Sequence, residues 1–191
     1  MSKLKKSFYN RNTLQVAQDC IGKRIVYNAP CGNMSARIVE VEAYIGKNDP
    51  ACHASRGKTK RNEVMFGHAG ISYIYLIYGM YNCLNFVTEE DGFHAAVLLR
   101  AAEVEDGFDL MLPNNPKKSE TRILSGPGLF CKAFGLAKEQ NGIDLTKDTL
   151  YLESCSKKKI DIVKAERIGI SEGKEHLWRF YDKSSDSISK K

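Results

Sequence analysis

The sequence has no apolar run long enough to cross a bilayer. Its basic amino end, residues 1–10, is not followed by an apolar stretch, so we expect neither a secretory signal nor a membrane anchor. These absences predict a protein that has no membrane partner.

Motifs for metals and nucleotides are also missing. The six cysteines form no C-x-x-C pair and have no regular spacing, and several lie in apolar runs, where a thiol acts as a small hydrophobe. The sequence contains no Walker-type loop, dinucleotide fingerprint, zinc pattern or internal repeat. We therefore expect reduced cysteines, as in a cytosolic protein, and no metal site.

The composition is that of a single folded unit. The chain has 191 residues, of which 42% are hydrophobic, and this is enough for a sizeable core without disulfides. Its net charge of +6 is a weak indication of an acidic partner such as nucleic acid, because part of the excess lies in the chain ends. We expect one domain over residues 1–182 and a polar, disordered tail over residues 183–191.

Helix and strand signals are interspersed along the chain. Asn12 can cap a helix that ends at Gly22, and further helices are expected over residues 105–112 and 125–135. Short strands typical of an antiparallel sheet are expected over residues 23–29, 34–44, 93–102, 150–153, 160–165 and 178–182.

The strand over residues 34–44 carries two carboxylates. Strict alternation places Glu40, Glu42 and Tyr44 on one face with Ile38, and Val39, Val41 and Ala43 on the other. Glutamates on a strand are most often solvated, so the pattern alone leaves their role open.

Residues 46–62 form a small, polar and basic segment that predicts a loop with little core of its own. Arg56, Lys58, Lys60 and Arg61 can contact phosphates there, although a surface insertion would have the same composition. His53 is undecided on local grounds.

Residues 71–85 carry four tyrosines around Gly79 and predict a strand, a tight turn and a second strand. Alternation puts Tyr73 and Tyr75 on one face and Ile74 on the other, with Tyr78 at the turn. A large ring is hardest to bury at a turn, although tyrosines in a sheet core are the commoner arrangement.

Arg100 interrupts the apolar strand over residues 93–102. A buried guanidinium needs an anionic partner, and Glu40, Glu42 or a bound phosphate could supply it.

Several segments carry a family pattern in register. They are Glu40–Tyr44, His53-x-x-x-Gly57-x-Thr59-x-Arg61-Asn62-x-x-Met65-Phe66, Tyr73-x-Tyr75-x-x-Tyr78-Gly-Met-Tyr81-x-x-x-Asn85, Leu98–Ala101, Ser125-Gly-Pro127, Arg167–Ile170 and Arg179–Tyr181. Together they resemble the 3-methyladenine (alkyladenine, methylpurine) DNA glycosylase family over nearly the whole chain.

The resemblance implies the fold and the activity. It implies a single mixed α/β (α+β) domain with a curved antiparallel β-sheet, surrounding helices and a protruding β-hairpin. It also implies a monofunctional glycosylase of DNA base-excision repair, which flips alkylated purines out of the duplex and hydrolyses the N-glycosidic bond. Two positions depart from the family: Val104 stands where proline is usual, and residues 182–187 replace a turn that usually contains Gly-Asn.

Roles for individual residues follow from the same resemblance. Glu42 matches the general base that activates water, and Arg100 an arginine near it. The residues that match the substrate pocket are Tyr44, His53, Tyr75 and, at its floor, Asn85, whereas Tyr78 matches the wedge pushed into the minor groove. Glu40 is expected to be structural and to pair with a basic group.

The expected partner is double-stranded DNA containing alkylated or deaminated purines, bound by a monomer without cofactors. We expect a cytoplasmic location, at the nucleoid in a bacterium, or a nuclear one in a eukaryote. Two alternatives remain: a non-catalytic nucleic-acid-binding module that uses the aromatic hairpin and the basic loop, and a bifunctional enzyme with lysine Schiff-base chemistry, for which Lys58 and Lys60 lie nearby in sequence.

Overall fold

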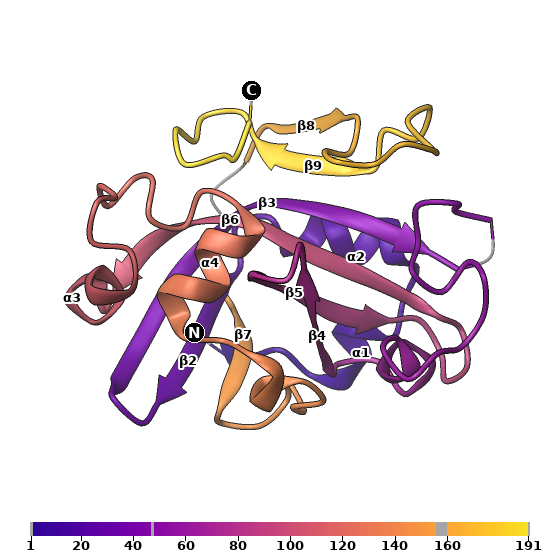
Figure 1. Ribbon diagram of the computed structural model, residues 1–191, viewed down its shortest axis with the longest axis horizontal. Coiled ribbons are helices and arrows are strands. Elements are labelled where there is room, and N and C mark those ends of the chain that lie inside the picture. The colour runs from indigo at the N-terminus through magenta and orange to yellow at the C-terminus, as the bar shows by residue number, and fades with distance from the viewer. Residues whose placement is uncertain (1, 47, 156–159, 191) are drawn as a thin grey trace.

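A large antiparallel sheet organises the computed structural model, which describes residues 2–46, 48–155 and 160–190 (Figure 1). The strands are β1 (Ser2–Lys3), β2 (Arg24–Ala29), β3 (Gly32–Ile45), β4 (Ser72–Ile77), β5 (Tyr81–Thr88), β6 (Ala95–Asp106), β7 (Leu150–Ser154), β8 (Ile162–Ala165) and β9 (Arg179–Asp182). The helices are α1 (Lys6–Tyr9), α2 (Thr13–Cys20), α3 (Phe108–Met111) and α4 (Pro127–Phe134), with short 3-10 helices at Glu63–Phe66, Leu112–Asn114 and Lys138–Gln140.

The sheet has the strand order β1-β7-β2-β3-β6-β5-β4, and every neighbouring pair is antiparallel. The terminal strands β1 and β4 do not pair with each other, so the sheet is not closed into a barrel. Strands β2 and β9 share one edge of β3: β2 pairs along its first half, and β9 pairs at Glu40–Glu42. The expected mixed fold with an antiparallel sheet is confirmed.

Helices α2 and α4 pack on the main hydrophobic core, which also takes side chains from β2, β3, β5 and β6. The Asn12 side chain accepts hydrogen bonds from the backbone N–H groups of Leu14 and Gln15, which is the predicted cap of α2. Helix α4 ends at Gly135, whose φ of 65° few other residues adopt. Among the described residues, no helix is both long and apolar enough to cross a membrane.

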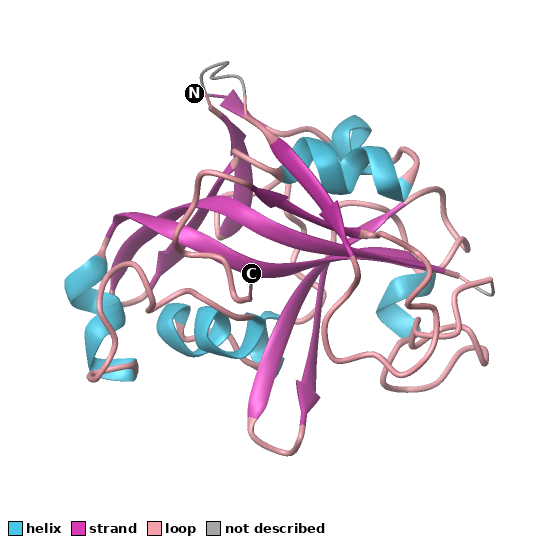
Figure 2. Ribbon diagram, turned by 90° about the horizontal axis from the view of Figure 1, so that it is seen from above, coloured by secondary structure: helices cyan, strands magenta, loops and turns pink. Residues whose placement is uncertain are grey.

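The predicted hairpin is formed by β4 and β5, which extend as a two-stranded arm out of the sheet (Figure 2). Ile77 pairs with Tyr81, and the N–H of Met80 donates to the Ile77 carbonyl at 3.2 Å. Tyr78 and Gly79 between them have φ values of 53° and 67°, the positive angles of a type I′ turn. A tyrosine at positive φ is strained, and the closed hairpin holds it there.

Strand β3 does not follow the strict alternation expected for it. Its register with β6 shifts between Ile38 and Glu40 and again between Glu40 and Val41, and this β-bulge interrupts the alternation of faces. Ile38 therefore lies in the main core with Val41 and Ala43, whereas Val39 packs with Ala101 and Ile188 in a separate cluster. The predicted grouping of Val39 with Val41 is wrong.

The loop after β3 has a core, contrary to expectation. Cys52 and Ala54 are buried with Met65 and Tyr73 in a second hydrophobic cluster. Asp49, whose side chain is fully buried, binds the equally buried Arg167 guanidinium through two hydrogen bonds of 2.6 and 2.7 Å. Residues far apart in sequence supply these contacts, which is why the local composition did not reveal them.

The carboxyl-terminal residues 183–190 are folded against the sheet, whereas a disordered tail is expected from their polarity. Ile188 is 3% exposed, and its carbonyl oxygen accepts hydrogen bonds from Ser125 and Arg122. The Ser185 hydroxyl donates to the Glu103 carboxylate at 2.6 Å, and the Ser189 hydroxyl donates to the Glu40 carboxylate at 2.9 Å. Lys191 at the end of the expected tail, Lys47 in the basic loop, Met1 and residues 156–159 lie outside the described residues.

The helix expected over residues 105–112 is shorter in the structure. Strand β6 continues to Asp106, which pairs with Ser35, and Gly107 at a φ of 82° then turns the chain into α3. The sequence predicts a helix from residue 105, but residues 105 and 106 remain in β6 because this strand pairs with the long strand β3 as far as Asp106. Val104 lies within this extension, opposite Ala36.

The pair between Asp49 and Arg167 gives the first prediction. Asp49→Ala is expected to lower the free energy of unfolding by about 3–5 kcal/mol, because it leaves a buried guanidinium without its counter-ion. Urea unfolding measures the change. Asp161→Ala, which breaks the exposed pair with Lys183, serves as control with an expected loss below about 1 kcal/mol. Equal losses in the two variants would contradict the prediction.

Candidate active site

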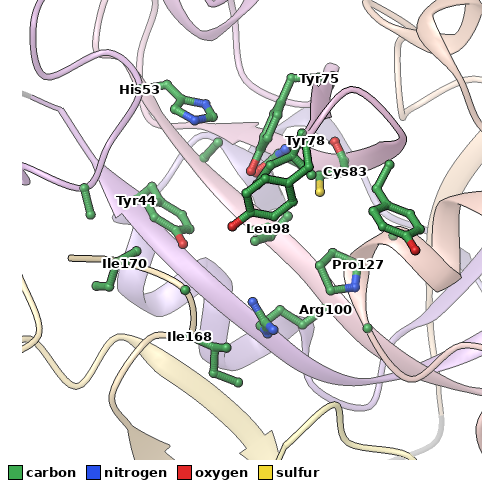
Figure 3. Close-up of a pocket in the computed structure, with 18 of the residues that line it drawn as sticks. Tyr44, His53, Tyr75, Tyr78, Cys83, Leu98, Arg100, Pro127, Ile168 and Ile170 are labelled. Atoms are coloured by element: carbon green, nitrogen blue, oxygen red, sulfur yellow. Dashed lines mark hydrogen bonds between the residues drawn. The ribbon is translucent and has the colours of Figure 1, made fainter. Parts of the chain in front are cut away.

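A pocket of about 740 Å³ opens beside the hairpin (Figure 3). Its wall is built from β3, the loop after it, both hairpin strands, β6, the start of α4 and residues 168–172. Because these segments are distant in sequence, the pocket exists only in the folded chain.

Aromatic side chains form one side of the pocket. Tyr44 comes from β3, His53 from the loop and Tyr75 from β4, and all three line the cavity. The rings of His53 and Tyr75 meet edge to face, with their centroids 4.4 Å apart. The His53 Nδ1 atom lies 3.3 Å from the Tyr73 hydroxyl, which fixes the imidazole at the loop. The structure thus brings together the three aromatic residues that the sequence predicts.

Guanidinium groups lie over two of these rings. Arg167 is 4.8 Å from the ring centroid of Tyr44 and 5.1 Å from that of Trp178. Arg61 is 5.1 Å from the ring centroid of Tyr75 and donates a hydrogen bond to the Leu76 carbonyl. Cation–π contacts of this kind stabilise ring positions by about 0.5–2 kcal/mol each.

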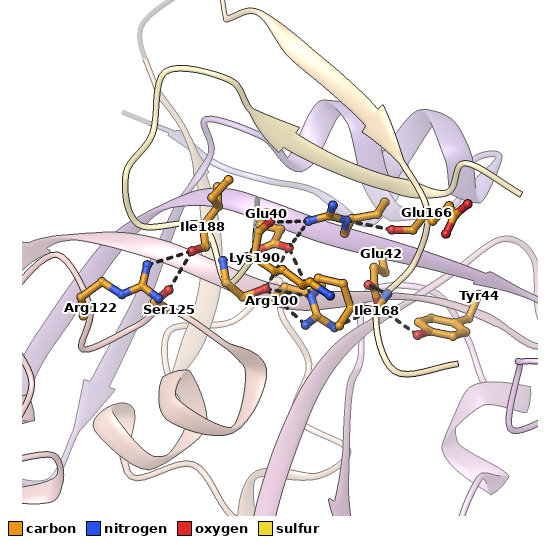
Figure 4. Close-up of polar contacts among 12 residues, drawn as sticks. Glu40, Glu42, Tyr44, Arg100, Arg122, Ser125, Glu166, Ile168, Ile188 and Lys190 are labelled. Carbon is orange, nitrogen blue, oxygen red and sulfur yellow. Dashed lines mark hydrogen bonds and ion pairs between the residues drawn. The ribbon is translucent and has the colours of Figure 1, made fainter. Parts of the chain in front are cut away.

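The carboxylate of Glu42 is fully buried directly behind this lining (Figure 4). Its Oε1 accepts from the N–H of Ile168 at 2.7 Å, and its Oε2 accepts from the Tyr44 hydroxyl at 2.9 Å and from Arg100 Nη1 at 3.2 Å. All three partners line the pocket. A carboxylate has about four acceptor positions, so these three bonds leave room on Oε1 for one more donor.

Glu40 lies one strand repeat away and has a different environment. It is also fully buried, and its Oε1 is 3.0 Å from Arg179 Nη1 and 3.3 Å from Arg100 Nε. Glu40 therefore pairs with basic groups, as the sequence predicts. Arg100 therefore pairs with both Glu40 and Glu42, the two carboxylates that the sequence offers as its partners; its Nη1 lies 3.2 Å from Glu42 Oε2.

Burial controls the protonation of this site. Loss of solvation raises the pKa of Glu42, although the charge of Arg100 and the Ile168 N–H act in the opposite direction. Burial and the neighbouring Glu42 raise the pKa of Tyr44 well above its usual value, so its hydroxyl remains a donor. Burial and the charge of Arg61 lower the pKa of His53, which favours a neutral imidazole.

Asn85 is 3% exposed and lies at the pocket wall on β5. Its amide nitrogen donates to the carbonyl oxygens of Tyr73 at 3.0 Å and Cys83 at 3.2 Å. The side chain is therefore held by the hairpin backbone and faces the cavity in one orientation.

The remaining predicted residues lie outside the buried centre. The Tyr78 ring, at the hairpin tip, is 78% exposed and borders the pocket mouth. Arg56, Lys58, Lys60 and Arg61 are all exposed on the loop, and Arg61 also contacts the hairpin through the Tyr75 ring and the Leu76 carbonyl.

Comparison with known proteins decides the family. The family model described as methylpurine-DNA glycosylase (MPG) matches residues 7–186. The chain belongs to the methylpurine-DNA glycosylase family. It is therefore a DNA glycosylase, as the resemblance predicts.

Relatives of this methylpurine-DNA glycosylase are similar over their full length. A protein of Methanocella arvoryzae is 50% identical, and the match covers 100% of this chain and 98% of the relative. Proteins of Alkaliphilus oremlandii and Desulfitobacterium hafniense are 43% and 44% identical, over 99% and 100% of this chain and 100% of each relative. All three are named as candidate 3-methyladenine DNA glycosylases.

Sequence reasoning missed several contributors to the glycosylase site. Ile168 acts through its backbone N–H, which carries no residue-specific signal, although its segment belongs to the family pattern. Gly128 is needed where α4 meets the hairpin, since a Cβ there would lie 2.8 Å from the Tyr81 ring. Ser189 lies in a segment whose polarity suggests a tail, yet it contacts both Arg100 and Glu40. Within the described part of the chain, no three His, Cys, Asp or Glu residues are grouped as metal ligands.

The raised pKa of Glu42 predicts a pH-dependent stability. The folded-state pKa lies above the unfolded value of about 4.3, so the wild-type glycosylase loses stability as the pH rises from that value through the folded pKa. Glu42→Gln buries no charge, so its stability relative to wild type should increase with pH across this window. The gain is up to about 1.4 kcal/mol for each unit between the two pKa values.

Urea unfolding between about pH 4 and pH 8 measures this difference. Glu120→Gln, an exposed position, controls for the change in net charge. Parallel stability curves for wild type and Glu42→Gln would contradict the prediction.

Proposed function

We propose that this glycosylase flips alkylated purines out of duplex DNA and hydrolyses their N-glycosidic bond with water activated by Glu42. The observation that carries the proposal is the buried carboxylate of Glu42 behind an aromatic pocket, with one acceptor position unused. The proposed partner is double-stranded DNA with alkylated or deaminated purines, bound by a monomer in the compartment that holds the DNA.

The chemistry of the reaction suits this carboxylate. Glycosidic hydrolysis passes through an oxocarbenium-like sugar, and an anion beside it both takes a proton from water and offsets the developing positive charge. Raising the pKa of Glu42 by burial makes it a stronger base than an exposed glutamate. The Arg100 guanidinium opposes this rise in the pKa and so favours the ionised carboxylate.

The aromatic wall suits an alkylated purine. Purines alkylated at N3 or N7 are cationic, and a cation over an electron-rich ring gains about 0.5–2 kcal/mol. Tyr44, His53 and Tyr75 would surround such a base, with His53 held neutral by its lowered pKa. The Arg167 and Arg61 contacts hold the Tyr44 and Tyr75 rings in place for stacking.

Selectivity against normal guanine is assigned in this proposal to Asn85. Its amide nitrogen is fixed by two carbonyl groups, so the side chain resists rotation when a base enters. An exocyclic amino group placed against it would meet a steric and desolvation penalty of about 1–3 kcal/mol, roughly tenfold to a hundredfold in rate.

The hairpin tip and the basic loop would contact the duplex. The exposed Tyr78 can fill the gap that a flipped base leaves, and a flipped base loses a few kcal/mol of stacking. Arg56, Lys58, Lys60 and Arg61 are exposed and can bind phosphates, and Arg61 also lies over the Tyr75 ring. Lys58 and Lys60 do not line the pocket, which counts against Schiff-base chemistry at these two lysines.

The first test of function is Glu42→Gln. The amide keeps the shape but has no basic oxygen, so release of 3-methyladenine from methylated duplex DNA should fall by about 10²-fold or more. Affinity for the same DNA, measured by fluorescence anisotropy, should remain. A variant that releases bases at a near-normal rate would remove Glu42 from this role and favour a mechanism without it.

The second test replaces the ring at the hairpin tip. Tyr78→Asn suits the positive φ at this position and so preserves the turn. Loss of the ring should slow excision from duplex DNA by about tenfold to a hundredfold, the usual effect of removing one stacking contact, with less effect on single-stranded DNA. Tyr78→Phe retains the ring and should behave as wild type. An equal fall on both substrates would rule out a wedge.

A further inference from the structure

The side chain of Ser189 lies between the two charged groups that surround the proposed catalytic centre. Its hydroxyl oxygen accepts from Arg100 Nε at 3.3 Å and Nη2 at 3.2 Å, and donates to Glu40 Oε1 at 2.9 Å. Its backbone N–H donates to Glu40 Oε2 at 2.6 Å. One serine thus makes two hydrogen bonds with the guanidinium of Arg100 and two with the carboxylate of Glu40.

These contacts are on the side of Arg100 that faces away from Glu42. The guanidinium offers its Nη1 edge to Glu42 Oε2 and its other donors to Ser189 and Glu40. Because a guanidinium is planar and rigid, fixing the Nε and Nη2 atoms also fixes the direction of Nη1. The rotation of Arg100, and with it the contact to Glu42, depends on Ser189.

The segment that carries Ser189 is itself anchored on both sides of the residue. The Ile188 carbonyl accepts from Ser125 Oγ at 2.9 Å, and the Lys190 carbonyl accepts from Arg179 Nη1 at 2.9 Å. The Ile188 side chain packs on Val39 of β3 and Ala101 of β6, the strands that carry Glu40 and Arg100. The serine is therefore positioned by the same strands as the charges it contacts.

We propose that Ser189 is a positioning residue for catalysis, which holds Arg100 in the orientation that contacts Glu42, the proposed base. This inference rests on the proposed role of Glu42 as the base. It assigns a function in the active centre to a carboxyl-terminal segment that does not line the pocket.

The test is Ser189→Ala, studied under single-turnover conditions with methylated duplex DNA. The rate of base release at neutral pH should fall about tenfold, because the hydrogen bonds of the hydroxyl to Arg100 and Glu40 are lost, with affinity for the DNA changed less than about twofold. The acidic limb of the rate profile should move to higher pH, because a displaced Arg100 no longer opposes the rise that burial causes in the pKa of Glu42.

The matched control is Ser185→Ala. Ser185 lies in the same segment and also donates to a carboxylate, Glu103, at 2.6 Å, but this contact is not part of the Arg100 network. Its loss should lower the melting temperature without moving the pH profile. Ser189→Thr, which keeps the hydroxyl, should restore both the rate and the acidic limb.

Each outcome bears on the proposal. An unshifted acidic limb in Ser189→Ala, or a loss of rate no larger than in Ser185→Ala, overturns it. If Ser189→Ala does not fold, Ser189→Cys is used in its place, because a thiol is similar in size to a hydroxyl but is a weak acceptor. The acidic limb of its rate profile should move to higher pH in the same way. Glu42→Gln separates the two hypotheses: an active Glu42→Gln refutes the proposed base, whereas an inactive one beside a normal Ser189→Ala refutes only the positioning role.

Discussion

The buried chain of charges from Arg179 through Glu40 and Arg100 to Glu42 is the interaction on which the site depends. Two carboxylates and two guanidiniums alternate along it, with neighbouring groups 3.0 to 3.3 Å apart. A single buried charge is strongly destabilising, but an alternating set with satisfied hydrogen bonds is tolerated. Glu42 can remain ionisable in the interior because Arg100, Glu40 and Arg179 are buried with it and balance its charge.

This chain of charges also connects parts of the fold that share no sequence pattern. Strand β3 supplies both carboxylates, β6 supplies Arg100 and β9 supplies Arg179. The order of strands around β3, with β6 on one edge and β9 on the other, places these side chains side by side. The bulge between Ile38 and Val41 sets which face of β3 the glutamates occupy relative to the main core.

The pocket combines rigid walls with an exposed hairpin tip. Tyr44 and Tyr75 are held by strands and by guanidinium contacts, whereas Tyr78 is held only by the turn, at a φ of 53°. Strain and exposure of this kind are uncommon in a structural role and are typical of functional sites. The burial of Glu42 is also typical of a functional site. It raises the pKa of the carboxylate, which lowers the stability of the folded protein but makes Glu42 a stronger base.

The sequence by itself determined the elements and the family. The cap at Asn12, the hairpin around Gly79 and most of the strands follow from local propensity and alternation, which act over a few residues. The family pattern in the sequence points to Glu42 and to the aromatic residues Tyr44, His53 and Tyr75. Only the tertiary structure decided the partners of Arg100, the core of the basic loop and the folded end of the chain around Ser189. These features depend on contacts between residues far apart in sequence, such as Glu40 and Ser189, which are 149 positions apart. Whether such residues are buried is decided by the fold and not by their neighbours in sequence.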